Sequence, residues 1–486
     1  MKLLNRFAGC TIFNIKLFYF IVLTLCLNIA GAQDKTIADY IAAAPFKMAV
    51  PTVPSFAAKT FSIVDYGAVG NDKTLNTEAF AKAIDACSAA GGGRVTVPAG
   101  NWLTGPIELK NNIDLHTEKD AVIQFTDDHS RYPMIKAGPG SSKIVPASPI
   151  YGYGLNNIAI TGSGIFDGAG DSWRPVKKSK VSQGEWDAMI AKGGALSADG
   201  KVYWPDRAMM DNDIRPYMLY LVGCSNILLK DVTLRNSPKF VFYPNRCNNL
   251  TMNGVHVFNE WWAQNVDGID ISACKNVVIY HCTVNAGDDG ICMKSSGEPD
   301  AVDTANLCNV LIAACTVLRA HGGFVIGSNT DGGMKNIFVT NCNFIGSDVG
   351  VRIKSNSGRG GWIRDIYVKD ITMKNIVNEA VLFDTYYEDA AVGKSKNSTT
   401  ETRDKIPDFR NIYLSDILCD GAATAISITG LPEMKVRSIY FENISVTSKK
   451  GFVCKDAEDI YLKHVKIDAS KPLYDTNGCK NISIVE

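Results

Sequence analysis

The sequence carries no excess charge of either sign, because its 50 Lys and Arg residues balance 50 Asp and Glu residues. A neutral chain has no overall field that would draw it to nucleic acid or to a membrane surface. Any polyanionic ligand must therefore be bound by a few local cations. Histidine is scarce, with six residues in 486, and no Cys–Cys or Cys–His pair has zinc-ligand spacing. The 46% hydrophobic content is that of a folded globular protein without extended disorder.

Long apolar runs are also missing after residue 32, so no later stretch could span a membrane as a helix. Within the first 32 residues, three cations precede the apolar stretch LFYFIVLTLCLNIA and a small-residue site that ends at Ala32. This order predicts a signal peptide over residues 1–32, cleaved near Ala32. We therefore expect an exported protein, located in a periplasm, at a cell surface or outside the cell. Residues 33–60 would form an N-terminal extension, followed by one domain over residues 61–486.

A repeated pattern runs through most of that domain. Each copy has a polar residue, usually Asn or Asp, just before an apolar anchor, and further apolar residues two, five and seven positions later. Such alternating pairs on either side of a polar bend predict two short strands. One unit cannot bury its apolar face alone, so about ten stacked copies predict an all-β, single-domain parallel β-helix. The anchors are Ile227, Leu250, Val277, Val310, Ile337, Ile366, Ile412, Ile439, Ile460 and Ile482.

The 14 cysteines, 12 of them after residue 32, follow the same register. They occupy positions where other copies carry aliphatic residues, for example Cys282, Cys315 and Cys342 five residues after an anchor. We expect small buried hydrophobic side chains that are mostly free thiols, with a disulfide left open. The segment TEAFAKAIDACSAAGGG, from 77 to 93, predicts a helix that caps the N-terminal end. Residues 167–215 and 386–408 break the period and predict long loops, which are often functional.

The stretch NAGDDGICMKSS, from 285, places two carboxylates side by side next to an apolar run, where like charges repel. Aligning the motifs NVDG, GDDG, AHGG and DVGVRIK on one glycine column explains this arrangement. Strands in neighbouring coils lie about 4.8 Å apart, so residues far apart in sequence should meet on one wall. Crowded carboxylates cannot all ionise, and one of them should hold its proton near neutral pH. The alignment stacks Asp267 on Asp289 and Asp288 on His321, with Arg352 and Lys354 on the next coil.

These four ordered motifs resemble the signature of glycoside hydrolase family 28, the pectin-degrading polygalacturonases. The segment DYGAVGNDKTLNTEAFAKAI is also similar to the opening coil of that family, so the resemblance covers nearly the whole chain from residue 60. It implies a right-handed parallel β-helix and an inverting hydrolysis of α-1,4-linked galacturonic acid without metal or cofactor. By the same resemblance, Asp288 is the general acid, Asp267 and Asp289 hold and deprotonate water, and His321 supports the acid. Arg352 and Lys354 would bind the sugar carboxylate.

Several further residues are candidates for substrate contact: Asn265, Lys294, Arg359 and Tyr386. Asn265 matches the family's Asn-Thr-Asp motif, although Val266 replaces its Thr. Gly290 replaces the usual Cys after the aspartates, and Tyr243 replaces a usual His.

The expected substrate is a pectic polysaccharide or oligogalacturonide, and the expected state is a monomer. The two long insertions favour release of short units from a chain end. A rhamnogalacturonan- or xylogalacturonan-cleaving enzyme is the main alternative. A calcium-dependent pectate lyase and a non-catalytic polysaccharide binder also remain open.

Overall fold

The computed structural model describes residues 35–299, 304–387, 405–470 and 474–486, and the predicted signal peptide lies outside them. The chain divides into two compact units, Met1–Ala43 and Ala44–Glu486. The described part of the first unit contains helix α2 (Ile37–Ala42), which begins at Thr36 with a capping box formed with Asp39. None of the described helices is long and apolar enough to cross a membrane.

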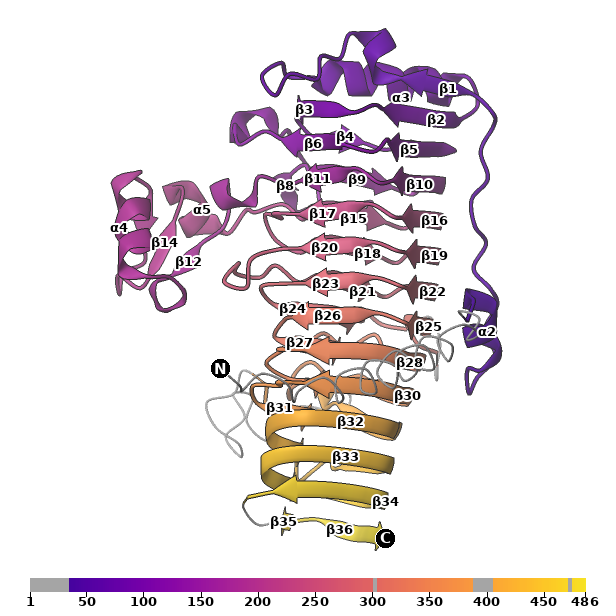
Figure 1. Ribbon diagram of the computed structural model, residues 1–486, viewed down its shortest axis with the longest axis vertical. Helices are drawn as coiled ribbons and strands as arrows, with labels where there is room; N and C mark the ends of the chain where they lie inside the picture. Colours follow the sequence, from indigo (N-terminus) through magenta and orange to yellow (C-terminus); the bar gives the residue numbers. More distant parts are fainter. Residues whose placement is uncertain (1–34, 300–303, 388–404, 471–473) are drawn as a thin grey trace, which may run out of the picture. The chain divides into compact units, whose positions relative to one another are not determined.

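The second unit is a right-handed parallel β-helix, which confirms the predicted fold class. Among the described residues, 31 strands join into one sheet that winds around the molecule in three walls (Figure 1). The wall that concerns function begins with β4 (Ile107–Glu108), β9 (Ile150–Tyr153), β15 (Leu219–Val222), β18 (Phe242–Asn245), β21 (Ile269–Ser272), β24 (Asp289–Lys294), β27 (Gly322–Ile326), β29 (Val351–Lys354) and β31 (Glu379–Asp384).

The other walls contain the repeats read from the sequence. The second wall begins with β1 (Thr60–Ser62), β2 (Gly93–Val97), β5 (Ile113–Thr117), β10 (Asn156–Gly162), β16 (Ser225–Lys230), β19 (Asn248–Asn253), β22 (Lys275–Tyr280) and β25 (Leu307–Ala313). The third contains β3 (Gly100–Thr104), β6 (Ala121–Phe125), β11 (Ile165–Asp167), β17 (Thr233–Arg235), β20 (His256–Phe258), β23 (Thr283–Asn285) and β26 (Thr316–Arg319). Longer strands continue toward the C-terminus: β28 (Met334–Ile345), β30 (Trp362–Lys374), β32 (Asp408–Thr429), β33 (Val436–Lys455), β34 (Ala457–Ala469), β35 (Tyr474–Asn477) and β36 (Lys480–Val485).

The polar residue before each anchor has a backbone reason. Asn249 and Asn276 have left-handed φ angles of 53° and 58°, a conformation that Asn adopts more readily than most residues. Asn249 Nδ2 also donates a hydrogen bond to Asn226 Oδ1 at 3.1 Å, so the asparagines connect neighbouring coils. The anchor that follows, such as Val277, points into the core and is fully buried. The repeat therefore combines a bend that Asn favours with an inward apolar column.

The cysteine and cap predictions hold. The 12 cysteines among the described residues are free thiols, and all except Cys308 and Cys479 are buried. Helix α3 (Thr77–Ala89) lies within the predicted 77–93 segment and buries one face, including Phe80 and Ile84. This helix covers the end of the β-helix, where an open coil would otherwise expose its core.

The insertion at 167–215 is not the plain loop predicted from sequence. It contains α4 (Gln183–Ala191), α5 (Arg207–Asn212) and a small antiparallel sheet of β12 (Val176–Lys177), β14 (Val202–Trp204) and β13 (Ala195–Leu196). Tyr132, Trp173 and Met209 form a separate small core beneath it. The elements are too short for hydrophobic periodicity to reveal, which explains the wrong prediction. Of the second predicted loop, residues 388–404 lie outside the described part.

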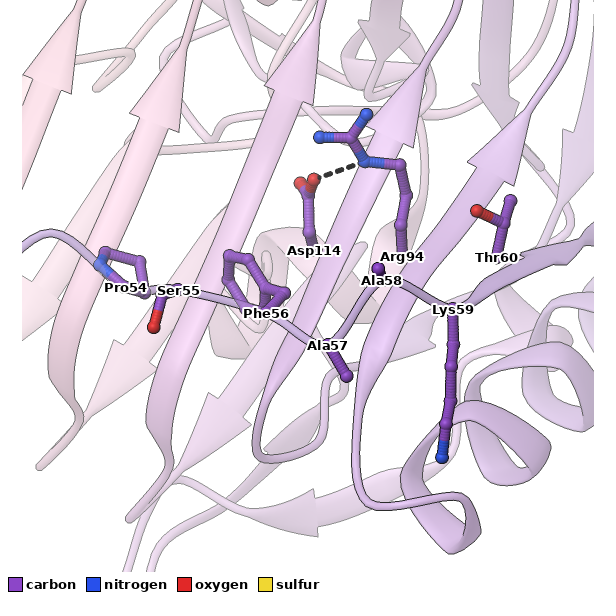
Figure 2. Close-up of a pocket in the computed structure, with 9 residues that line it drawn as sticks. All are labelled: Pro54, Ser55, Phe56, Ala57, Ala58, Lys59, Thr60, Arg94 and Asp114. Atoms are coloured by element: carbon purple, nitrogen blue, oxygen red, sulfur yellow. Dashed lines mark hydrogen bonds and ion pairs between the residues drawn. The ribbon is translucent and has the colours of Figure 1, made fainter.

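The extension before the β-helix also has defined contacts. Figure 2 shows Pro54–Lys59 running across the second wall, just below the ion pair of Arg94 and Asp114 in this view, whose Nε and Oδ2 lie 2.8 Å apart. The hollow there has a volume of about 370 Å³ and contains none of the predicted site residues. It therefore belongs to the packing of the extension against the first coils.

Candidate active site

The predicted glycine column is confirmed by the strand register. Ile269 pairs with Ile291, Ile291 with Phe324, and Phe324 with Val351, so the glycines that precede these four residues lie in one column. His321 N donates to Asp288 O at 2.7 Å, and Gly268 N donates to Asp289 O at 2.8 Å. The aspartates and His321 therefore lie on adjacent coils at the start of β21, β24 and β27.

Three carboxylates meet at this position. Asp267, Asp288 and Asp289 each contribute one oxygen to a group in which all three atoms lie within 4.8 Å of one another. Asp267 and Asp289 are 3% and 2% exposed, whereas the side chain of Asp288 is 18% exposed. Asp288 is therefore the member of the trio that is partly open to solvent.

Asp289 is held in its ionised form by cations from a later coil. Lys354 Nζ donates to Asp289 Oδ2 at 2.7 Å, and an Arg352 guanidinium nitrogen lies 3.8 Å from Oδ1. Burial alone would raise the pKa of Asp289, but Lys354, followed by Lys294 and Arg352, lowers it to about 2. Oδ1 is buried and has no hydrogen-bond donor within the described part of the chain. A carboxylate with so low a pKa is a weak base, so this oxygen is suited to accept a hydrogen bond rather than a proton.

Asp267 has the opposite electrostatic environment. Lys294 Nζ lies 3.2 Å from Asp267 Oδ2 and 3.0 Å from Asp270 Oδ1, and this lysine is 8% exposed. Burial and the charge of Asp270 raise the pKa of Asp267 well above its ordinary value, since Lys294 is shared between the two acids. Asp267 therefore lies in an environment that favours its protonated form, unlike Asp289. The resemblance assigns the acid role to Asp288 instead.

Asp270 was missed by the sequence reasoning although a signal existed. It lies two residues after Gly268, in the same column as Arg352, and is completely buried. Lys294 was predicted as a possible substrate contact, but its ammonium group is committed to two internal carboxylates. Its pKa is raised well above the usual value because Asp270 and other neighbouring groups outweigh the effect of burial.

His321 connects Asp288 to the next coil. Its Nδ1 lies 3.1 Å from Asp288 Oδ1, and its Nε2 lies 3.8 Å from an oxygen of Asp348, a second acid that the sequence reasoning missed. The hydrogen bond to Asp288 raises the pKa of His321, despite the opposing effect of burial. His321 is therefore suited to carry a proton next to Asp288.

The remaining candidates lie around this centre. Asn265 Oδ1 accepts a hydrogen bond from Arg215, which comes from the end of the 167–215 insertion, at 3.1 Å. Tyr386 is buried, with 6% exposure, whereas the ring of the adjacent Tyr387 lies 4.7 Å from Lys354 Nζ. Arg359 lies in a turn after Asn356. The contacts of the predicted Tyr386 and Arg359 with substrate stay predictions, and Tyr387 is the tyrosine that contacts a site cation.

Aromatic side chains border the site on the N-terminal side. The Lys294 ammonium lies 5.1 Å from the centre of the Phe240 ring, and Tyr217 packs against both Phe240 and Tyr243. Tyr243, which occupies the place of a usual His, stacks on Tyr220 with ring centres 5.5 Å apart. This substitution therefore extends an aromatic stack rather than supplying another titratable imidazole.

The carboxylate trio could be mistaken for a metal site, since its spacing would suit one ion. Hard cations such as Ca²⁺ require several oxygen ligands with excess negative charge. Here Lys294 and Lys354 already neutralise the outer oxygens of Asp267 and Asp289. The donor set therefore does not fit a calcium ion, which argues against the lyase alternative.

Comparison with known proteins identifies the family of the chain. The chain is 28% identical over 430 residues to a probable polygalacturonase of Vitis vinifera, covering 84% of this chain and 79% of that one. It is 30% identical over 414 residues to an exo-poly-alpha-D-galacturonosidase of Dickeya chrysanthemi, covering 78% and 66%. Among solved structures, a hyperthermoactive exopolygalacturonase from Thermotoga maritima superposes with a TM-score of 0.68 at 25% identity, covering 88% and 94%. The sequence model of the family "Glycosyl hydrolases family 28" matches residues 176–466, and the chain therefore belongs to this family of glycoside hydrolases.

Proposed function

We propose that the protein is an exported polygalacturonase that hydrolyses α-1,4-linked galacturonic acid in pectin and releases short units from a chain end. The observation that carries the proposal is the meeting of three carboxylates within 4.8 Å, bordered by His321, Arg352 and Lys354. The names of the relatives from Vitis, Dickeya and Thermotoga support the substrate, and the latter two names support action at a chain end. The sequence pattern of residues 1–32 supports export.

The geometry suggests a distribution of roles. Asp288, the most exposed carboxyl of the trio, protonates the leaving oxygen, and His321 at 3.1 Å stabilises its ionised form afterwards. Asp289 orients the attacking water through its free Oδ1, while Asp267, whose pKa is raised, accepts the proton of that water once ionised. Arg352, whose side chain is 18% exposed, would bind the carboxylate of the sugar, and Lys354, which is 3% exposed and bonded to Asp289, would add its positive charge to that site.

The stereochemical outcome rests on the family resemblance. In inverting enzymes the two carboxyl groups are usually about 6.5–9.5 Å apart, which is wider than the contact distance within this trio. We nevertheless propose inversion on the strength of that resemblance. Identification of the first anomer released decides this point: inversion gives the β anomer, and retention gives the α anomer.

The test is a parallel digestion of unesterified polygalacturonate and rhamnogalacturonan, with identification of the released sugars by chromatography and NMR. We expect galacturonate units from the first polymer only. The Asp288→Asn variant should lose at least about a thousandfold in turnover, because general acid catalysis is removed. Release from rhamnogalacturonan alone would favour the alternative substrate. A rise in ultraviolet absorbance from unsaturated products would instead identify a lyase.

A further inference from the structure

Next to the carboxylate trio, two cations converge on one indole ring. Lys180 Nζ lies 4.6 Å from the ring centre of Trp261, and the guanidinium carbon of Arg319 lies 4.7 Å from the same centre. Lys180 comes from the 167–215 insertion, whereas Arg319 ends strand β26. Neither cation has an acidic partner among the residues that the structure describes. Because both lie within 4.7 Å of one ring centre, the two charges are at most about 9 Å apart, and together they favour binding of an anion.

The position of this group is fixed relative to Asp288. A Cβ added to Gly287 would lie 2.2 Å from Ala263 O and 2.8 Å from Glu260 O, so the loop that carries Trp261 packs directly on Gly287. On the other side, Ala286 N donates to Arg319 O at 2.8 Å. Trp261 and Arg319 therefore lie one coil to either side of the segment that leads into Asp288.

A strand irregularity brings Arg319 into place. The pairing of β23 with β26 shifts by one residue, so that Arg319 rather than Leu318 lies opposite Asn285. Bulges of this kind re-aim side chains and are frequent beside active sites. Leu318, the extra residue, is 42% exposed. The one-residue shift therefore sets the direction of the Arg319 side chain, which the regular repeat would place elsewhere.

We propose that Lys180, Trp261 and Arg319 form an accessory subsite, the cationic rim, that binds the carboxylate of a second uronic acid residue in the substrate chain. This inference rests on the proposed function and deepens it. The indole holds both cations in position by cation–π contact, so less ordering entropy is lost when the polymer binds. The rim is separate from the pair Arg352 and Lys354, which faces Asp289.

The test compares the kinetics of Lys180→Ala and Arg319→Ala on unesterified polygalacturonate with those of Lys178→Ala. Lys178 is a matched control, since it lies two residues from Lys180 and its Nζ lies 5.7 Å from another indole, that of Trp186. We expect each rim variant to raise KM about fivefold at low salt while kcat stays within twofold, as for loss of one charge-assisted contact. The increase should shrink at high salt, and the control should match the wild type.

Two results would refute the proposed role of the cationic rim while leaving the proposed function intact: an unchanged KM in both variants, or a fall in kcat alone.

A wild-type protein that releases no uronic acid would instead contradict the proposed function. In that case affinity electrophoresis in intact polygalacturonate tests the rim separately. Reduced retention of the two rim variants, but not of Lys178→Ala, would still support it, and equal retention would refute it. Trp261→Phe, which keeps a ring, should affect KM less than Trp261→Ala, and the reverse order would contradict the indole's role.

Discussion

The buried lysine Lys294 offers a quantitative test of how the site tolerates its carboxylates. Its Nζ lies 3.2 Å from Asp267 and 3.0 Å from Asp270, and both acids are buried. Replacing Lys294 by Met keeps much of the side-chain volume but removes the cation. Loss of one partner from a buried ion pair costs about 3–5 kcal/mol of unfolding free energy.

An independent estimate gives a similar value. Without Lys294, the fully buried Asp270 must be protonated in the folded state, and its ordinary pKa is 3.8. Holding that proton at pH 7 costs about 4 kcal/mol, and at pH 5 it costs about 1.6 kcal/mol, since each pH unit contributes about 1.4 kcal/mol. In the variant the folded pKa lies above the unfolded pKa, so stability is greatest at low pH and falls as pH rises. The defect of Lys294→Met should therefore grow from pH 5 to pH 7.

The assay is denaturant unfolding at both pH values, with a reductant present to keep the thiols free. The double variant Lys294→Met/Asp270→Asn removes both charges and should recover most of the lost stability, while Asp270→Asn alone should cost less than Lys294→Met. A defect below about 1 kcal/mol at pH 7, or one that grows on acidification, would refute the internal role of Lys294. A contact with substrate would then be the better explanation of this lysine.

Three further predictions concern neighbouring groups. His321→Gln should lower kcat about ten- to a hundredfold and remove an alkaline limb of the pH profile. This limb should begin above the usual His pKa of 6.5, because the hydrogen bond to Asp288 raises the pKa of His321. If the limb is unchanged in the variant, a group other than His321 causes it. Lys354→Met should reduce the unfolding free energy by about 3 kcal/mol and turnover at least a hundredfold, because the buried carboxylate of Asp289 loses its cation. Calorimetry and kinetics measure the two effects, with Lys354→Arg as the control. Wild-type stability of Lys354→Met would contradict the prediction. Mild oxidation with oxidised glutathione should form a disulfide between Cys454 and Cys479 before other thiols react, because their sulfur atoms lie 3.1 Å apart and Cys479 is partly exposed. Peptide mapping by mass spectrometry measures this, and earlier modification of other cysteines would disprove it.

Much of the site's register was predictable from sequence because the β-helix translates one glycine column directly into spatial order. The stacking of Asp267 on Asp289 and of Asp288 on His321 follows from backbone pairing alone. The partners of Lys294 did not follow in the same way. The register of Lys294 was predictable, but side-chain packing decides whether its ammonium group faces solvent or an internal carboxylate.

The cationic rim could not be predicted for a different reason. Arg319 reaches Trp261 only because β26 has a one-residue shift, and the sequence repeat gives no sign of that shift. Lys180 comes from an insertion whose short helices and strands carry no clear period. Residues outside the repeat therefore escape an argument that is based on periodicity.

The two adjacent aspartates are compatible with folding because each is directed to a different cation on a later coil. Asp289 turns toward Lys354 and is buried, while Asp288 turns toward His321 and remains partly exposed. The glycine on either side makes this close stacking possible. A Cβ at Gly290 would lie 2.8 Å from a side-chain carbon of Val317, and one at Gly287 would meet a carbonyl oxygen at 2.2 Å. The four residues of Gly-Asp-Asp-Gly therefore act together. The glycines allow neighbouring coils to approach closely, and this short distance lets the cations offset the repulsion between the carboxylates.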